Sequence, residues 1–117
     1  MALILVVDDE YTIALTLAEV LRWNGHEVET AANGKLALEA IRARRPALVL
    51  LDYMMPVLDG LQALAVIRAD PELANIPVVL MSAASEATIP TSARWDAFLR
   101  KPFREPALVA VLATLLP

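Results

Sequence analysis

Midway along the chain stands the run Leu48-Val49-Leu50-Leu51-Asp52, in which four aliphatic residues end abruptly at a carboxylate. A segment of the same form, Leu3-Ile4-Leu5-Val6-Val7-Asp8-Asp9, lies near the start of the sequence. Short runs rich in Val and Leu are typical of parallel strands that are buried on both faces. Ligands of such sheets bind outside the carboxyl ends of the strands. The two runs therefore predict two buried strands that carry three carboxylates into one crevice.

The rest of the sequence alternates between strand-like and helix-like segments. Apolar residues recur every three or four positions in the helical segments, and glycine or proline stands near several of their ends. Gly25 is expected to end the first helix, because glycine reaches the left-handed conformation without strain. We expect strands over residues 3–7, 27–31, 48–51, 77–81 and 97–99, and helices over residues 12–24, 35–44, 61–69 and 105–116.

This alternation predicts an α/β fold in which helices cover both faces of a parallel sheet. The flavodoxin-like, doubly wound strand order 2-1-3-4-5 fits best, as a five-stranded (βα)5 sheet. The first and third strands are neighbours in that order, so Asp8, Asp9 and Asp52 converge although more than forty positions separate them. Three carboxylates repel one another unless a hard cation lies among them, and oxygen ligands of this kind suit Mg²⁺.

Composition narrows the class of protein. A length of 117 residues predicts a single domain over residues 1–117, and 58% hydrophobic with only 5% aromatic residues predicts an aliphatic core. The sequence has neither an apolar run of about 18 residues nor the basic start of a signal peptide, so we expect a cytoplasmic protein without a membrane span. A net charge of −4 argues against direct binding to nucleic acid. The lack of cysteine excludes disulfides and thiolate metal sites.

With these motifs in view, the chain resembles the response regulator receiver domains of two-component signalling, the CheY-like domains. The resemblance runs from Leu3 to about Leu116 and so covers nearly the whole chain. Each motif is weak by itself, but together they are specific. They are Asp8-Asp9-Glu10, Gly25, Gly34, Leu48 to Asp52, Met55-Pro56, Asp59-Gly60, Pro77-Val78, Ser82-Ala83, Phe98-Leu99 and Lys101-Pro102-Phe103. Gly60 is expected to supply backbone freedom to the loop after Asp52.

Asp52 is the predicted phosphoacceptor, because a carboxylate directly after a buried strand can act as a nucleophile toward a phosphoryl group. A helix-capping or turn aspartate is the alternative interpretation. The resemblance implies that Asp8, Asp9 and Asp52 bind Mg²⁺, Asp9 directly and Asp8 partly through water. It also implies that the backbone carbonyl of Met54 is a ligand. Taken alone, the acidic run at residues 8–10 would indicate only a charge bias at the start of a helix.

The resemblance implies three further site residues. Lys101 is expected to reach the acylphosphate, to pair with Asp52 before phosphorylation, and to precede Pro102 through a cis peptide bond. Ser82 is expected to donate its hydroxyl group to the new phosphoryl group, although an isolated serine here would more often be a capping residue. Phe98 is expected to be the switch aromatic that turns inward as that hydroxyl moves. An ordinary core phenylalanine is the alternative.

The segment before Lys101 departs from the family pattern. Only 19 positions lead from Ser82 to Lys101, a few fewer than is usual in the family, and Pro90 breaks an α-helix. We therefore expect a shortened fourth helix. The pair Arg94-Trp95 stands where many receivers have Gly-Ala, so the connection to the fifth strand is made without the conformational freedom of glycine.

The last predicted helix is apolar beyond one face. A homodimer through this fifth helix, or contact with a partner, would cover such a surface, and a merely alanine- and leucine-rich helix is the alternative. The apolar stripe of this helix consists of Leu108, Val111, Leu112 and Leu115, with Val109 and Leu116 beside it.

Two other residues are expected to be structural. Trp23 is expected to pack at the end of the first helix, and His26, the only histidine, is expected to be a surface residue.

We expect a module that takes a phosphoryl group from a histidine kinase or a histidine phosphotransfer protein and signals by conformational switching to a downstream protein target. It is not expected to be an enzyme beyond its own phosphorylation and slow dephosphorylation. A phosphohydrolase of the haloacid dehalogenase type is one alternative, but its chemistry needs a second acid where this chain has Met54. A receiver cut from a larger transcription factor or hybrid kinase is the other. We expect no DNA-binding or enzymatic domain after the last helix, and therefore expect output by protein contact.

Overall fold

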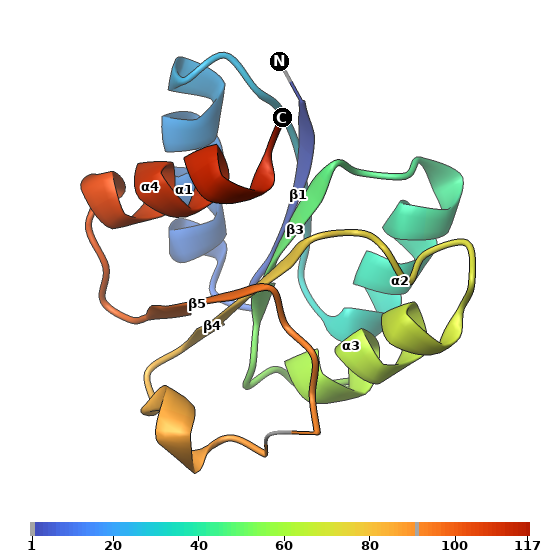
Figure 1. The fold of residues 1–117 in the computed structure, drawn as a ribbon. Helices are drawn as coiled ribbons and strands as arrows, with labels where there is room; N and C mark the ends of the chain where they lie inside the picture. The colour runs from blue at the N-terminus through green and yellow to red at the C-terminus, as the bar shows by residue number, and fades with distance from the viewer. Residues whose placement is uncertain (1, 91) are drawn as a thin grey trace.

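The computed structural model describes residues 2–90 and 92–117, which form one five-stranded sheet with helices on both faces (Figure 1). Neighbouring strands are parallel throughout, and their order is β2-β1-β3-β4-β5. The predicted flavodoxin-like order is thus confirmed. The strands are β1 (Leu3–Val7), β2 (Glu27–Ala31), β3 (Leu48–Asp52), β4 (Val78–Ser82) and β5 (Ala97–Arg100).

The described residues form four α-helices that cover the sheet, each within one residue of its predicted bounds. They are α1 (Tyr11–Trp23), α2 (Gly34–Ala43), α3 (Gly60–Ala69) and α4 (Glu105–Leu115). The helices α1 and α4 pack on one face of the sheet, and α2 and α3 pack on the other. No helix among the described residues is long and apolar enough to cross a membrane.

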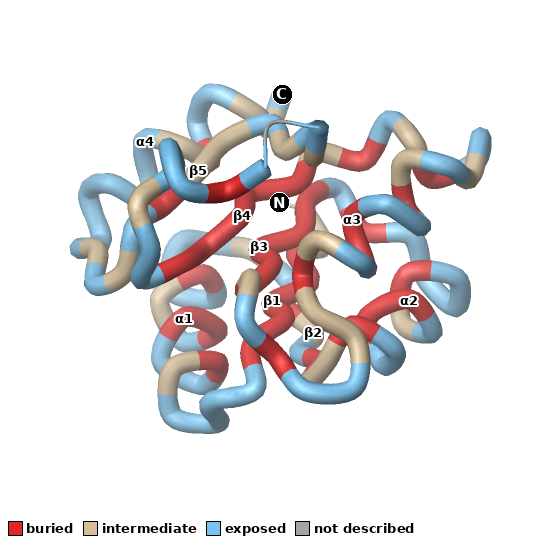
Figure 2. The backbone as a smooth tube through the Cα atoms, turned by 90° about the horizontal axis from the view of Figure 1, so that it is seen from below, coloured by how far each residue is buried: buried red, intermediate tan, exposed pale blue. Residues whose placement is uncertain are grey.

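The strands lie at the centre of the molecule and are mostly buried (Figure 2). Their residues alternate between two hydrophobic clusters. Leu5 and Val7 join the cluster beneath α2 and α3, whereas Ile4 and Val6 join the one beneath α1 and α4. Successive side chains of a strand point to opposite faces, so an uninterrupted aliphatic strand fills both clusters. Both faces of each strand are therefore occupied by the core, and polar functional side chains have room only at the strand ends.

The segment that was predicted to form a short fourth helix is even less helical than expected. Between β4 and β5 the described residues contain a single 3₁₀ turn, η1 (Glu86–Thr88), and no α-helix. Pro90 follows two residues later and lacks the N–H group that a continuing helix would need. The helix that the sequence predicts as the fifth is consequently α4 in this structure.

Hydrogen bonds and an ion pair of Arg68 and Asp96 hold the connection into β5. The Arg68 guanidinium donates to the Asp96 carboxylate at 2.7 Å and to the carbonyl oxygens of Ala74 and Ile76 at 3.0 and 2.8 Å. Asp96 also accepts from the backbone N–H of Val78 at 2.7 Å. The start of β5 is thereby tied to α3 and β4, so the connection forms without glycine.

Four further expectations, for Trp23, Gly25, His26 and the last helix, have different outcomes. Trp23 does not pack at the end of α1, because its side chain is 88% exposed. Gly25 has a φ of 90°, which confirms that it ends the helix in the left-handed conformation. His26 is only partly exposed rather than a free surface residue. The apolar stripe of α4 packs against the sheet, with Leu108 and Leu112 buried, and dimerisation stays a prediction.

Candidate functional site

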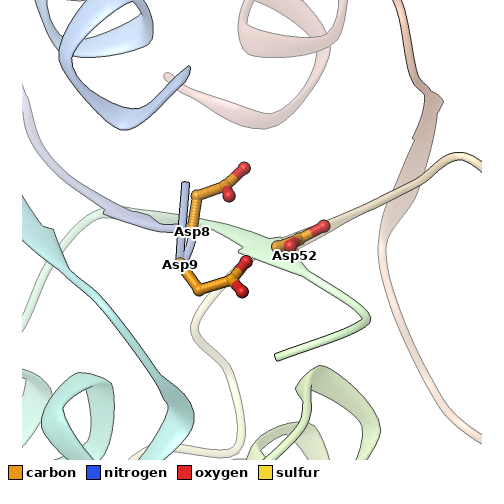
Figure 3. Close-up of side chains that lie close together, drawn as sticks. All are labelled: Asp8, Asp9 and Asp52. Carbon is orange, nitrogen blue, oxygen red and sulfur yellow. The ribbon is translucent and has the colours of Figure 1, made fainter. Parts of the chain in front are cut away.

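Three carboxylates converge at the carboxyl end of the sheet. Val7 pairs with Leu51, so the residues that follow them in β1 and β3 lie side by side. One oxygen from each of Asp8, Asp9 and Asp52 lies within 4.8 Å of the others, as predicted from the strand order (Figure 3). Asp8 and Asp52 are buried, whereas Asp9 faces solvent. The two buried acids thus depend on neighbouring charges for their stability.

Lys101 supplies one of those charges. Its Nζ lies 3.0 Å from Oδ1 of Asp52, which confirms the predicted pairing. The same ammonium lies 2.7 Å from Oδ2 of Asp8, an ion pair that the sequence did not predict. The backbone N–H of Lys101 donates to the carbonyl of Ser82 at 2.8 Å, and the bond to Pro102 is cis as predicted. The lysine is therefore held between β4 and the acidic cluster.

The electrostatic balance of the site makes Asp52 harder to ionise than a free aspartate. Burial raises the pKa of Asp52 to about 6, the charges of Asp8 and Asp9 add to this rise, and Lys101 opposes it. Burial alone would lower the pKa of Lys101, but its hydrogen bonds to Asp8 and Asp52 outweigh burial and raise it. Lys101 thus stays charged, and three carboxylates face one ammonium.

The donor set fits a hard divalent cation. It consists of carboxylate oxygens from Asp8, Asp9 and Asp52, with no nitrogen or sulfur ligand in the cluster that the described residues form. Such oxygen ligands suit Mg²⁺, which tolerates water in its remaining positions. A divalent charge would also offset the two carboxylates that Lys101 leaves unbalanced. The acidic triad is thus able to hold a metal ion.

Two further residues of the predicted site lie in the neighbouring strands β4 and β5. Ser82 is buried at the end of β4, and its Oγ accepts a hydrogen bond from the N–H of Ala84 at 3.0 Å. Phe98 is partly buried in β5, where it pairs with Leu80. Its ring centroid lies 6.1 Å from that of Trp95. The switch roles of Ser82 and Phe98 stay predictions.

The loop after Asp52 differs from the expectation in its backbone. Gly60 does not have a positive φ; its lack of a side chain is needed because a Cβ would overlap the carbonyl oxygen of Asp52 and lie 2.9 Å from the Cα of Tyr53. The residue with positive φ in this loop is Val57, at 70°. Met54 projects into solvent with 69% exposure, and its carbonyl as a metal ligand stays a prediction.

Comparison with known proteins identifies the class that this fold and site define. A family model described as the response regulator receiver domain matches residues 4–113. The chain belongs to that family, and it is therefore a two-component signalling module rather than a classical enzyme. The haloacid dehalogenase interpretation is accordingly not supported. The prediction of one domain over all 117 residues is not tested by this match.

Individual relatives agree with this assignment. The chain is 37% identical over 110 residues to "DNA-binding response regulator MtrA" of Mycolicibacterium paratuberculosis, which covers 92% of this chain and 48% of the relative. It is 38% identical over 116 residues to "Response regulator MprA" of Mycolicibacterium vanbaalenii, covering 97% and 49%. The chain thus spans about half the length of these curated relatives.

Solved structures agree in fold. The chemotaxis protein CheY4 of Vibrio cholerae superimposes with a TM-score of 0.90 at 28% identity, covering 99% of both chains. The receiver domain of NtrX from Brucella abortus gives a TM-score of 0.85 at 39% identity, covering 97% of both. These similarities show that the chain shares the receiver architecture. A shared fold does not identify the partners of this chain, which depend on the residues at its surface.

Proposed function

We propose that Asp52 accepts a phosphoryl group from a phosphohistidine of a partner histidine kinase or histidine phosphotransfer protein. The observation that carries the proposal is the position of Asp52, buried at the end of β3 with Lys101 Nζ at 3.0 Å and two more carboxylates beside it. Membership in the receiver family supports the histidine-bearing donor. Asp8, Asp9, Asp52 and the carbonyl of Met54 would hold Mg²⁺.

The chemistry follows from the charges at the site. A carboxylate oxygen of Asp52 attacks phosphorus while the bond from phosphorus to the histidine nitrogen breaks and the imidazole keeps the bonding electron pair. A pKa of about 6 leaves most of Asp52 ionised at neutral pH and ready to attack. Bound Mg²⁺ supplies positive charge beside the phosphoryl oxygens. Lys101 stabilises the same oxygens with its ammonium group.

The output is a change of conformation. Ser82 turns its hydroxyl group toward the phosphoryl group on Asp52, and Phe98 follows by turning inward. Ser82 ends β4, and Phe98 lies opposite Leu80 in the neighbouring strand β5, so a shift at β4 reaches β5 directly. The switched surface then binds a downstream protein in the cytoplasm, and α4 is the proposed contact if the domain forms a homodimer.

A phosphorylation assay tests the proposed function. Incubation with acetyl phosphate and Mg²⁺ should add the mass of one phosphoryl group, detected by intact mass spectrometry. The gain should vanish in Asp52→Ala and in the presence of a chelator. Asp59→Ala is the matched control, because Asp59 caps α3 through Gln62 and lies outside the acidic cluster. A phosphoryl group that persists in Asp52→Ala would disprove the assignment.

The phosphorylated form is expected to be long-lived. The positions two residues after Asp52 and two residues after Ser82 face the attacking water in this family, and here they hold Met54 and Ala84, both exposed. Neither side chain can hydrogen-bond or orient that water, so this assistance to hydrolysis is absent. We expect Met54→Asn and Ala84→Glu each to speed loss of the phosphoryl group by about tenfold. Decay of the wild type within seconds, or unchanged decay in both variants, would contradict this.

A receiver that controls a DNA-binding segment is the second candidate. The relatives named as DNA-binding response regulators are about twice as long as this chain, so the part of those proteins beyond the match is available for DNA binding. The net charge of −4 makes these 117 residues themselves a poor partner for phosphate groups. The length of the native open reading frame decides between this candidate and a stand-alone receiver.

A further inference from the structure

Trp95 connects two segments that the proposed switch uses. Its indole Nε1–H donates a hydrogen bond of 2.8 Å to Oε2 of Glu86 in η1. Its ring also contacts Phe98, with centroids 6.1 Å apart and planes inclined by 50°. This tilted arrangement is within the range of favourable aromatic pairs. One side chain therefore bridges the 3₁₀ turn and the aromatic residue of β5.

The two ends of this bridge lie close in the chain to the switch residues. Glu86 is four positions after Ser82, on the segment that leaves β4. Ser82 Oγ accepts from Ala84 N–H at 3.0 Å, so the hydroxyl is tied to the start of that segment. At the other end, Trp95 and Phe98 are partly buried against the core beneath α2 and α3. The indole is thus anchored on the β5 side and hydrogen-bonded to the β4 side.

The missing fourth helix makes this bridge more important. Between β4 and β5 the described residues contain only the short turn η1, so few main-chain contacts hold the segment after Ser82. Arg100 Nε donates to the carbonyl of Ala83 in a long hydrogen bond of 3.3 Å. The Trp95 to Glu86 bond is shorter and reaches further along the segment. It is therefore the stronger of these two hydrogen bonds, while Ile89, directly after η1, is buried in the core.

We propose that Trp95 is a positioning residue that holds the segment 83–86 and the Phe98 ring in the unphosphorylated arrangement, and that phosphorylation of Asp52 releases its bond to Glu86. This inference rests on the proposed function, since it requires Ser82 and Phe98 to respond to Asp52. When Ser82 turns toward the phosphoryl group, the segment after it moves with it. Trp95 stays packed against the core on the β5 side, so the bond between the two segments breaks.

Tryptophan fluorescence tests the release. The variant Trp23→Phe leaves Trp95 as the sole tryptophan, and Trp23 is 88% exposed at the end of α1, away from the site. Acetyl phosphate with Mg²⁺ should shift the emission maximum of Trp95 to the red and increase its quenching by acrylamide. Intact mass is measured on the same samples. A complete gain of phosphoryl mass with unchanged emission and quenching would overturn the inference and leave the proposed function standing. A sample that gains no mass would overturn both.

The affinity for a phosphoryl mimic tests the direction of the effect. If the Glu86 bond favours the unphosphorylated state, its removal must favour the other state by the same free energy. Glu86→Ala should therefore lower the half-saturating concentration of beryllofluoride, in Mg²⁺, by about two- to fivefold. Glu86→Gln, whose amide oxygen can accept from the indole, should stay near the wild type. Glu39→Ala removes a carboxylate from the exposed face of α2 and serves as the charge control. Equal affinity in Glu86→Ala and the wild type would overturn the inference.

Discussion

Replacing Asp52 with asparagine is expected to stabilise the metal-free protein near pH 7.5. Burial raises the pKa of Asp52 from 3.8 to about 6 in the folded state. Ionising Asp52 therefore costs more free energy in the folded protein than in the unfolded chain. A rise of about two pKa units corresponds to an upper limit of ~3 kcal/mol. Asparagine keeps the shape without the charge, and Lys101 keeps its partner Asp8. The melting midpoint should rise by several degrees.

The stabilisation by Asp52→Asn should depend on pH in a defined direction. Above about pH 6, Asp52 is ionised in both states, and the penalty is fully present. As the pH falls toward 3.8, the carboxyl group is protonated in the folded state first, and the penalty disappears. The advantage of Asp52→Asn should therefore shrink between about pH 6 and pH 4. Calorimetric scans across this range, with Glu39→Gln as the control, measure it. A lower midpoint for Asp52→Asn near pH 7.5, or an advantage that does not change with pH, would contradict the argument.

The elements and their order could be predicted because each depends on a local pattern. Aliphatic runs that end in acids define β1 and β3, and every strand and helix boundary is within one residue of the expectation. Convergence of Asp8, Asp9 and Asp52 follows from parallel neighbours and needs no knowledge of side-chain positions. The acidic cluster is thus a consequence of topology, which alternation in the sequence specifies strongly.

The contacts that could not be predicted depend on where distant segments meet. The sequence does not show whether Lys101 also pairs with Asp8. Only the position of the strand end shows that it pairs with both Asp8 and Asp52. The connection into β5 is fixed by Arg68, which lies 28 positions before its partner Asp96. Trp95 has no local pattern that indicates its bond to Glu86. Pro90 could show only that the fourth helix would be short.

Gly60 is a further case in which the sequence did not predict a contact between distant segments. A glycine was expected to matter here, but for a different structural reason. Its sequence context suggested a turn that needs backbone freedom, whereas the structure shows a close approach between the start of α3 and the end of β3. The backbone N–H of Gly60 donates to the carbonyl of Tyr53 at 2.7 Å, which brings the two segments together. A side chain at this position would therefore meet main-chain atoms, which cannot rotate away.

Gly60→Ala is accordingly expected to destabilise the fold, although helix propensity alone favours alanine over glycine by up to about 1 kcal/mol. The added Cβ would overlap the carbonyl oxygen of Asp52 and crowd the Cα of Tyr53, so the backbone must shift. Overpacking against rigid atoms typically costs about 1–3 kcal/mol, and the shift here displaces the phosphoacceptor itself. Urea unfolding should therefore show a lower midpoint, and acetyl phosphate should label the folded variant more slowly.

The control for Gly60→Ala lies in the same turn. Gln62→Ala removes the side-chain acceptor for the N–H of Asp59, one half of the capping box of α3, and should cost no more than about 1 kcal/mol. Its labelling rate should match the wild type, because Asp52 is not displaced. A Gly60→Ala variant that is as stable as the wild type would show that the loop relaxes freely. One that is destabilised but labelled at the normal rate would show that β3 holds Asp52 in place independently of α3.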